Sequence, residues 1–191
     1  MRLLTLMAGV LLSATVPAVA QAPSSLTTAE QALMESAYTG KLEEVKRLLS
    51  EGTAVDATDI EKRTALMLTA FNGHTPVVEY LLEKGATVDA KDKNGRTALM
   101  YASSGPFERT VELLLKKGAE VDVQGKLEGF TALMTAAAEG HAGVVRLLVV
   151  NGANPALKDV DGDTAASFAE QNGHAAVVEL LRNPPPVIAR P

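Results

Sequence analysis

The fold is decided by residues 64–94, TALMLTAFNGHTPVVEYLLEKGATVDAKDKN, because this stretch recurs along the chain. Recognisable copies begin at Thr97, Thr131 and Thr164, at steps of 33, 34 and 33 residues, and a degraded copy occupies residues 29–61. A fixed period of roughly 20 to 50 residues is typical of a stacked repeat protein, in which each unit packs on its neighbours. The sequence therefore predicts an elongated array of five units.

Each copy carries the signals of two helices joined by a tight turn. Thr64 stands where its hydroxyl can cap the first helix, and Pro76 falls in the first turn of the second, where a missing N–H does no harm. Gly85 follows the second helix, a position that commonly requires a left-handed backbone. Residues 86–96 then alternate in polarity and turn at Asn94-Gly95, which is a hairpin signal. One apolar stripe of the second helix is formed by Val77, Val78, Leu81 and Leu82.

The motifs TALM, NGH and VVEYLLEKGATVDAKDKNG keep their register over successive copies and together resemble the ankyrin repeat. This resemblance implies an all-α solenoid of about five helix-turn-helix units, with short β-hairpin fingers projecting at one edge. The family's usual T-P-L-H appears here as TALM, with Met67, Met100 and Met134 in the His position. The hydrogen bonds that His makes in the family are thus expected to be absent. Methionine, flexible and apolar, is expected to fill the gap by packing.

The period divides the chain into five repeats between two unlike ends. The predicted repeat domain, residues 29–183, follows a flexible leader, residues 21–28, and precedes a proline-rich tail, residues 184–191. Three consecutive prolines prevent the last helix from continuing. The repeats are placed at residues 29–61, 62–94, 95–128, 129–161 and 162–183.

Residues 1–20 are typical of a cleaved export signal peptide. Arg2 supplies the positive charge, Leu3 to Val16 is an apolar run, and Ala18-Val19-Ala20 has the small-x-small cleavage form. The apolar run is shorter than the roughly 20 residues that span a bilayer, so cleavage is favoured over a membrane anchor. The chain has no Cys, which excludes disulfides. We therefore expect an exported bacterial type of ankyrin repeat protein, a periplasmic or secreted monomer with no stable membrane anchor.

The third copy departs from the repeat pattern at two places. Pro106-Phe107 replaces Gly-His, and the finger at residues 124–129 is one residue longer than its neighbours. One interpretation is drift in a tolerant loop, since insertions in loops have little effect on stability. The other is a locally reshaped surface with a function.

Charge and composition exclude some classes of partner. The formal net charge is −5 and no basic cluster is present, which argues against nucleic acid, because binding to phosphates requires cationic side chains. The three histidines, His74, His141 and His174, occupy one equivalent position. Neighbouring repeats lie about 10 Å apart, so these imidazoles cannot converge on one zinc ion or build a catalytic triad. No catalytic residue and no cofactor are predicted.

A calcium site is the most specific alternative. Asp159, Asp161, Asp163 and Glu170 fall at positions 1, 3, 5 and 12 of a calcium-binding loop. The sixth position is Thr164 instead of the Gly that the sharp turn needs. The repeat register also places this segment in a finger and Glu170 inside a helix. A calcium-binding or enzymatic protein is therefore the disfavoured class, and no metal site is predicted.

Partner binding is expected at outward positions that vary between copies. In ankyrin-like proteins these are the finger tips and the concave side of the first helix. The helix positions in this chain are Tyr38, Phe71, Ser104, Ala138 and Gln171, and the finger positions include Ile60, Glu61, Arg63, Lys93, Arg96, Leu127, Phe130 and Asp163. Because Tyr and Arg are enriched at interface centres, the predicted protein-binding residues are Tyr38, Ile60, Arg63, Phe71, Arg96 and Phe130. The alternative is that Tyr38 and Phe71 only cover the core.

These observations favour a non-catalytic protein–protein interaction module that binds a protein partner on its concave and finger face. One version protects or assists an exported enzyme in the periplasm. Another version is an inhibitor or immunity protein against an exported toxin. Both versions predict the same surface, so the sequence leaves them open.

Overall fold

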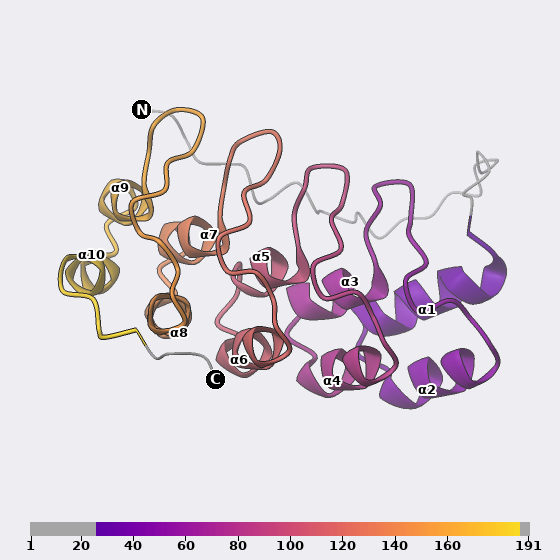
Figure 1. Ribbon diagram of the computed structural model, residues 1–191. Coiled ribbons are helices and arrows are strands. Elements are labelled where there is room, and N and C mark those ends of the chain that lie inside the picture. Colours follow the sequence, from indigo (N-terminus) through magenta and orange to yellow (C-terminus); the bar gives the residue numbers. More distant parts are fainter. Residues whose placement is uncertain (1–25, 188–191) are drawn as a thin grey trace.

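The computed structural model describes residues 26–187, and this range forms ten helices arranged as five consecutive pairs (Figure 1). The first helices of the pairs are α1 (Thr28–Tyr38), α3 (Ala65–Phe71), α5 (Ala98–Ala102), α7 (Ala132–Ala138) and α9 (Ala165–Gln171). The second helices are α2 (Leu42–Ser50), α4 (Thr75–Glu83), α6 (Glu108–Lys116), α8 (Ala142–Val150) and α10 (Ala175–Arg182). The expected all-α solenoid is confirmed.

Some predicted segments lie outside the described residues. They are the export signal at residues 1–20, residues 21–25 of the leader and residues 188–191 of the tail. Within residues 26–187, no helix combines the length and the apolar character that crossing a bilayer requires.

The helices form two rows, and the core lies between them. The first helices contact one another along one row, and the second helices do so along the other (Figure 1). Leu66, Leu81, Leu114 and Leu148 are almost completely buried between successive repeats. The methionines of the TALM motif are at most 4% exposed, so the expected packing of Met67, Met100 and Met134 into the stack is confirmed.

The first repeat begins earlier than the sequence suggested. Helix α1 starts at Thr28, and the Thr27 hydroxyl accepts a hydrogen bond from the Glu30 amide at 3.2 Å. The Glu30 carboxylate in return accepts from the Thr27 amide at 2.7 Å, which completes a capping box. Leu26 packs against the core. The residues just before Ala29, assigned to the leader from the repeat register, therefore contribute to the first helix.

A threonine side chain caps the first helix of the second, fourth and fifth repeats, but not that of the third. The Thr64 hydroxyl accepts from the Met67 amide at 3.3 Å, and the Thr131 hydroxyl accepts from the Met134 amide at 3.2 Å. The corresponding Thr97 hydroxyl is buried and has no hydrogen-bond partner among the described residues. It precedes α5, which has only five residues. The same TALM motif therefore forms a capping bond in two repeats and not in the third.

This difference predicts different responses of the two threonines to the same substitution. We expect Thr131→Val to lower the free energy of unfolding by about 0.5–2 kcal/mol, because it removes a helix cap. Thr97→Val should change it by less than about 0.5 kcal/mol or raise it, because the buried hydroxyl that it removes makes no hydrogen bond. Urea denaturation followed by far-UV circular dichroism measures both variants. Equal losses in the two variants would contradict the unpaired state of the Thr97 hydroxyl.

The fingers, which are the loops between successive helix pairs, are tight hairpin turns closed by backbone bonds, such as the one from the Asp59 amide to the Arg63 carbonyl at 3.1 Å. Within residues 26–187 no strand forms, and a single β-bridge joins Thr58 and Thr64. The Asp59 carboxylate accepts hydrogen bonds from the amides of Glu61 at 2.9 Å and Arg63 at 2.8 Å. Asp92 and Asp159 hold their fingers by the same kind of bond. Such side-chain bonds to the backbone take the place of further strand pairing, so the fingers close as short turns without extended strands.

Hydrogen bonds between repeats hold the stack in register. The Nε2 atom of His74 lies 3.1 Å from the carbonyl oxygen of Tyr38, and the Asn72 amide donates to the same oxygen at 2.8 Å. His141 and His174 contact carbonyl oxygens of the preceding repeats in the same way. The turn histidines are therefore structural. Neighbouring fingers are joined by backbone bonds, such as the one from the Lys93 amide to the Glu61 carbonyl at 2.9 Å.

The irregular third repeat contacts its neighbours through a packed aromatic ring and through side-chain hydrogen bonds of its longer finger. The Phe107 ring stands in the histidine position, and it lies so close to Gly73 and Gly105 that a Cβ atom on either would overlap it. In the longer finger, the Gln124 side-chain amide donates to the carbonyl oxygens of Gly129 at 2.8 Å and Lys158 at 2.9 Å. Both departures from the pattern thus make packing or hydrogen-bonding contacts within the stack.

Candidate functional site

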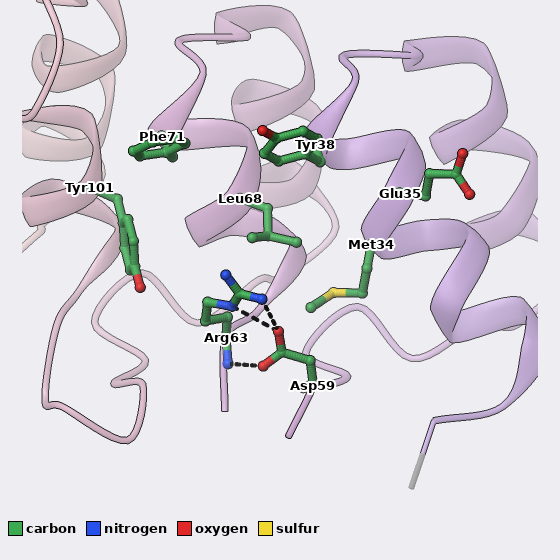
Figure 2. Close-up of a pocket in the computed structure, with 8 residues that line it drawn as sticks. All are labelled: Met34, Glu35, Tyr38, Asp59, Arg63, Leu68, Phe71 and Tyr101. Carbon is green, nitrogen blue, oxygen red and sulfur yellow. Dashed lines mark hydrogen bonds and ion pairs between the residues drawn. The ribbon is translucent and has the colours of Figure 1, made fainter. Parts of the chain in front are cut away.

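Three of the predicted binding residues, Tyr38, Arg63 and Phe71, line one pocket (Figure 2). The pocket has a volume of about 240 Å³ and is formed by α1, α3, α5 and the first finger, residues 58–64. We call it the α1/α3/α5 pocket. Its complete lining is Met34, Glu35, Tyr38, Asp59, Arg63, Leu68, Phe71 and Tyr101.

Aromatic and aliphatic side chains form the walls of the pocket. Phe71 and Tyr101 meet edge to face, with ring centroids 6.2 Å apart and an interplanar angle of 87°. This arrangement is favourable for aromatic pairs. Tyr38 and Leu68 are half-buried, while Met34 is 6% exposed. Aromatic side chains held at the surface in this way are typical of sites that anchor a binding partner.

The Arg63 guanidinium is held by the finger on which it lies. Its Nε and Nη2 atoms each lie 2.7 Å from Oδ2 of Asp59, so the ion pair is bidentate on the arginine side (Figure 2). The other carboxylate oxygen of Asp59 accepts two backbone amides of the same finger. The Arg63 side chain is 26% exposed and that of Asp59 17% exposed. The two opposite charges therefore neutralise each other, and the ion pair holds the Arg63 side chain beside Leu68 (Figure 2).

The Tyr101 hydroxyl donates its hydrogen bond to a buried carboxylate instead of to a ligand. It donates to Oδ2 of Asp92 at 2.8 Å, and Asp92 is only 3% exposed. Burial raises the pKa of Tyr101, and the hydrogen bond and negative charge of Asp92 raise it further. The hydroxyl therefore stays protonated at neutral pH and remains a donor to Asp92. What Tyr101 presents to the pocket is its apolar ring.

The other three predicted residues lie outside the pocket lining. Ile60 is 64% exposed on the first finger. The guanidinium of Arg96 forms an ion pair with Glu128 at 3.3 Å. The Phe130 ring packs edge to face on Phe168, with centroids 5.0 Å apart. Arg96 and Phe130 are thus engaged between later repeats, and the pocket brings together only three of the six predicted residues.

The sequence prediction missed five lining residues, among them Tyr101, whose ring packs on Phe71. Glu35, Leu68 and Tyr101 each lie three residues before a predicted helix position, which is about one helical turn. The repeat register could have identified them, because residues three apart share a helix face. Met34 and Asp59 carry no comparable signal, since one resembles a core residue and the other a turn residue.

The acidic cluster considered for calcium is engaged within the protein. The Asp159 carboxylate accepts the amides of Asp161 at 3.0 Å and Asp163 at 2.8 Å. Glu170 pairs with Arg182 at 3.0 Å. Within residues 26–187 no group of three or more His, Cys, Asp or Glu side chains could hold a metal ion. These carboxylates therefore stabilise the finger and the last helix pair.

Comparison with known proteins identifies the family. The family model described as ankyrin repeats (three copies) matches residues 33–125 and 105–187, which together span most of the chain. The search of curated proteins found no match. Ankyrin repeats generally mediate protein–protein binding, and proteins of this family are typically not enzymes. On the evidence of the helix pairs, the stacked rows and the family match, the chain belongs to the ankyrin repeat family.

Proposed function

We propose that this protein is a non-catalytic module of the periplasm, which binds an exported enzyme through the α1/α3/α5 pocket and protects or assists it. The observation that carries the proposal is the pocket itself. Its walls are apolar, and two of its polar groups, the Arg63 guanidinium and the Tyr101 hydroxyl, are bonded to Asp59 and Asp92. Burying an apolar side chain of a partner on such a surface makes the free energy of binding more favourable.

The side chains that most often perform chemistry have structural partners here. Each of the three histidines lies within 3.2 Å of a backbone carbonyl oxygen of the preceding repeat. Their spacing along the stack separates them from one another. These contacts favour binding over catalysis, because a general base must be free to meet the proton of a substrate.

The periplasmic location rests on the sequence of residues 1–20. The charge at Arg2, the apolar run and the small residues before Gln21 are the features of an export signal. A chain without cysteine is indifferent to the redox state of an exported compartment.

Site-specific cross-linking tests the proposal. Full-length protein carrying a photo-reactive residue in place of Leu68, in the pocket, should capture one exported protein in intact cells. The control carries the same residue in place of Tyr80, a half-buried aromatic of α4 whose ring lies 5.2 Å from Nζ of Lys84. We expect capture from position 68 and not from position 80.

Affinity for the captured protein then tests the pocket. We expect the double variant Tyr38→Ala and Phe71→Ala to bind about 10- to 100-fold more weakly, because truncation of aromatic anchors commonly costs 2 kcal/mol or more. Tyr80→Ala should bind like the wild type. Circular dichroism checks that both variants unfold cooperatively. Unchanged affinity of the double variant would contradict the proposed surface. Loss of the partner's activity on binding would favour the inhibitor or immunity function over protection.

A further inference from the structure

The size and walls of the α1/α3/α5 pocket define what it can hold. An apolar cavity of about 150 Å³ admits benzene, and pockets for drug-sized ligands begin at about 300 Å³. The volume of about 240 Å³ lies between these limits. Phe71 and Tyr101 already present an edge-to-face pair, to which a further ring can add in the same geometry. The pocket therefore suits one aromatic side chain.

The polar groups of the pocket oppose a polar occupant. The Arg63 guanidinium donates to Asp59, and the Tyr101 hydroxyl donates to Asp92. A polar group inserted between Leu68 and Phe71 would lose its bonds to water without gaining a partner from these two apolar side chains, which is unfavourable. A phenyl ring loses no hydrogen bond on entering, and an indole ring has a single N–H group to keep at the edge of the pocket.

The charge at the edge of the pocket adds a second requirement. Among the charged lining residues, Asp59 and Arg63 neutralise each other. Glu35 is exposed on α1 at the edge of the pocket, and its carboxylate forms no hydrogen bond or ion pair within residues 26–187 (Figure 2). The pocket therefore carries one uncompensated negative charge, which favours a cationic group beside the aromatic ring.

We infer that the pocket recognises a linear segment of a partner protein in which one aromatic side chain packs against the Phe71–Tyr101 pair and a basic residue meets Glu35. In an extended segment, residues two apart point to the same side, so the basic residue lies two positions from the aromatic one. This inference rests on the proposed function and adds the chemistry of the partner.

Short peptides test this inference directly. The chain contains no Trp, so the indole fluorescence of a Trp-containing peptide reports binding without background from the protein. The probe is a blocked pentapeptide, Ser-Trp-Ser-Lys-Ser. Two matched peptides carry Ser in place of Trp, or Glu in place of Lys. Methyl resonances of Met34 and Leu68, observed by NMR, locate the bound peptide.

The expected results separate the aromatic and the basic contributions. The Trp-Lys peptide should shift the Met34 and Leu68 resonances, and the peptide with Ser in place of Trp should not. The Trp-Lys peptide should bind about two- to fivefold more tightly than the Trp-Glu peptide, the effect of one exposed ion pair. Glu35→Gln should abolish this preference without changing the fold, because Glu35 is exposed and its carboxylate forms no hydrogen bond or ion pair within residues 26–187. Tyr80→Ala should leave peptide binding unchanged.

Three outcomes would overturn the inference: no shift at Met34 and Leu68, equal binding of the Lys and Glu peptides, or an unchanged preference in Glu35→Gln. Its failure is distinguishable from failure of the proposed function. If the cross-linked partner depends on Tyr38 and Phe71 while the peptides do not bind, the function stands and the linear aromatic-basic segment is wrong. If the peptides bind as expected and no exported protein is captured, the pocket chemistry stands and the function is wrong.

Discussion

Replacing Leu81 by alanine is expected to lower the free energy of unfolding by about 2–5 kcal/mol. Leu81 is 0% exposed, and its helix α4 packs against both α2 and α6. The substitution therefore leaves a cavity where three repeats meet. In a stacked protein each repeat is stabilised by its neighbours, so damage at this point weakens interfaces on both sides.

Urea denaturation followed by far-UV circular dichroism measures this effect, with Leu127→Ala as the matched control. Leu127 is 66% exposed, so the same substitution should change the free energy of unfolding by less than about 0.5 kcal/mol. An unchanged dependence on urea concentration would show that the variant still unfolds as one unit. A loss below about 1 kcal/mol in Leu81→Ala would contradict the close packing between these repeats.

Gly40→Ala is expected to lower the free energy of unfolding by about 2–3 kcal/mol, from two effects. Gly40 has a φ of 72°, in the left-handed region that a residue with a Cβ atom adopts at a cost. A Cβ atom there would also lie 2.6 Å from Nδ1 of His74. The His74 ring would have to move, and its contact with the Tyr38 carbonyl at 3.1 Å would be lost.

Gly85→Ala isolates the backbone effect. Gly85 has a φ of 86°, and no atom lies within 4 Å of a Cβ atom built on it. Its substitution should therefore be less destabilising than Gly40→Ala by at least about 1 kcal/mol, the value of a typical hydrogen bond. Denaturation curves give the two losses, and the NMR resonances of the His74 ring report its displacement. Equal losses in the two variants, with an unmoved His74, would contradict a role for Gly40 in joining the repeats.

Local signals in the sequence determined the helices and their order. The period of 33 to 34 residues predicted the pairs, Thr64 predicted a cap, and Gly85 predicted a left-handed residue after a helix. These signals act within about one helical turn, so they can be understood from neighbouring residues alone. The amphipathic stripe on α4 likewise identifies Leu81 as a core residue from the sequence alone.

The candidate site was predictable only in part, because it lies between repeats. Tyr38, Arg63 and Phe71 could be placed on the outward face from the repeat register alone. That Tyr101 completes the wall beside Phe71 depends on how α5 stacks on α3. That Arg96 and Phe130 are occupied by Glu128 and Phe168 depends on the later repeats in the same way.

The sequence by itself determined that the chain folds as stacked helix pairs, since that follows from the repeat period and from signals local to each copy. Only the tertiary structure decided where a pocket forms and which side chains remain available in it. Thr97 illustrates the difference, because the motif that caps α3 and α7 leaves its hydroxyl unpaired before α5. The physical reason is that hydrogen bonds and ring contacts between repeats depend on distances of a few ångströms, which the relative placement of the helices sets.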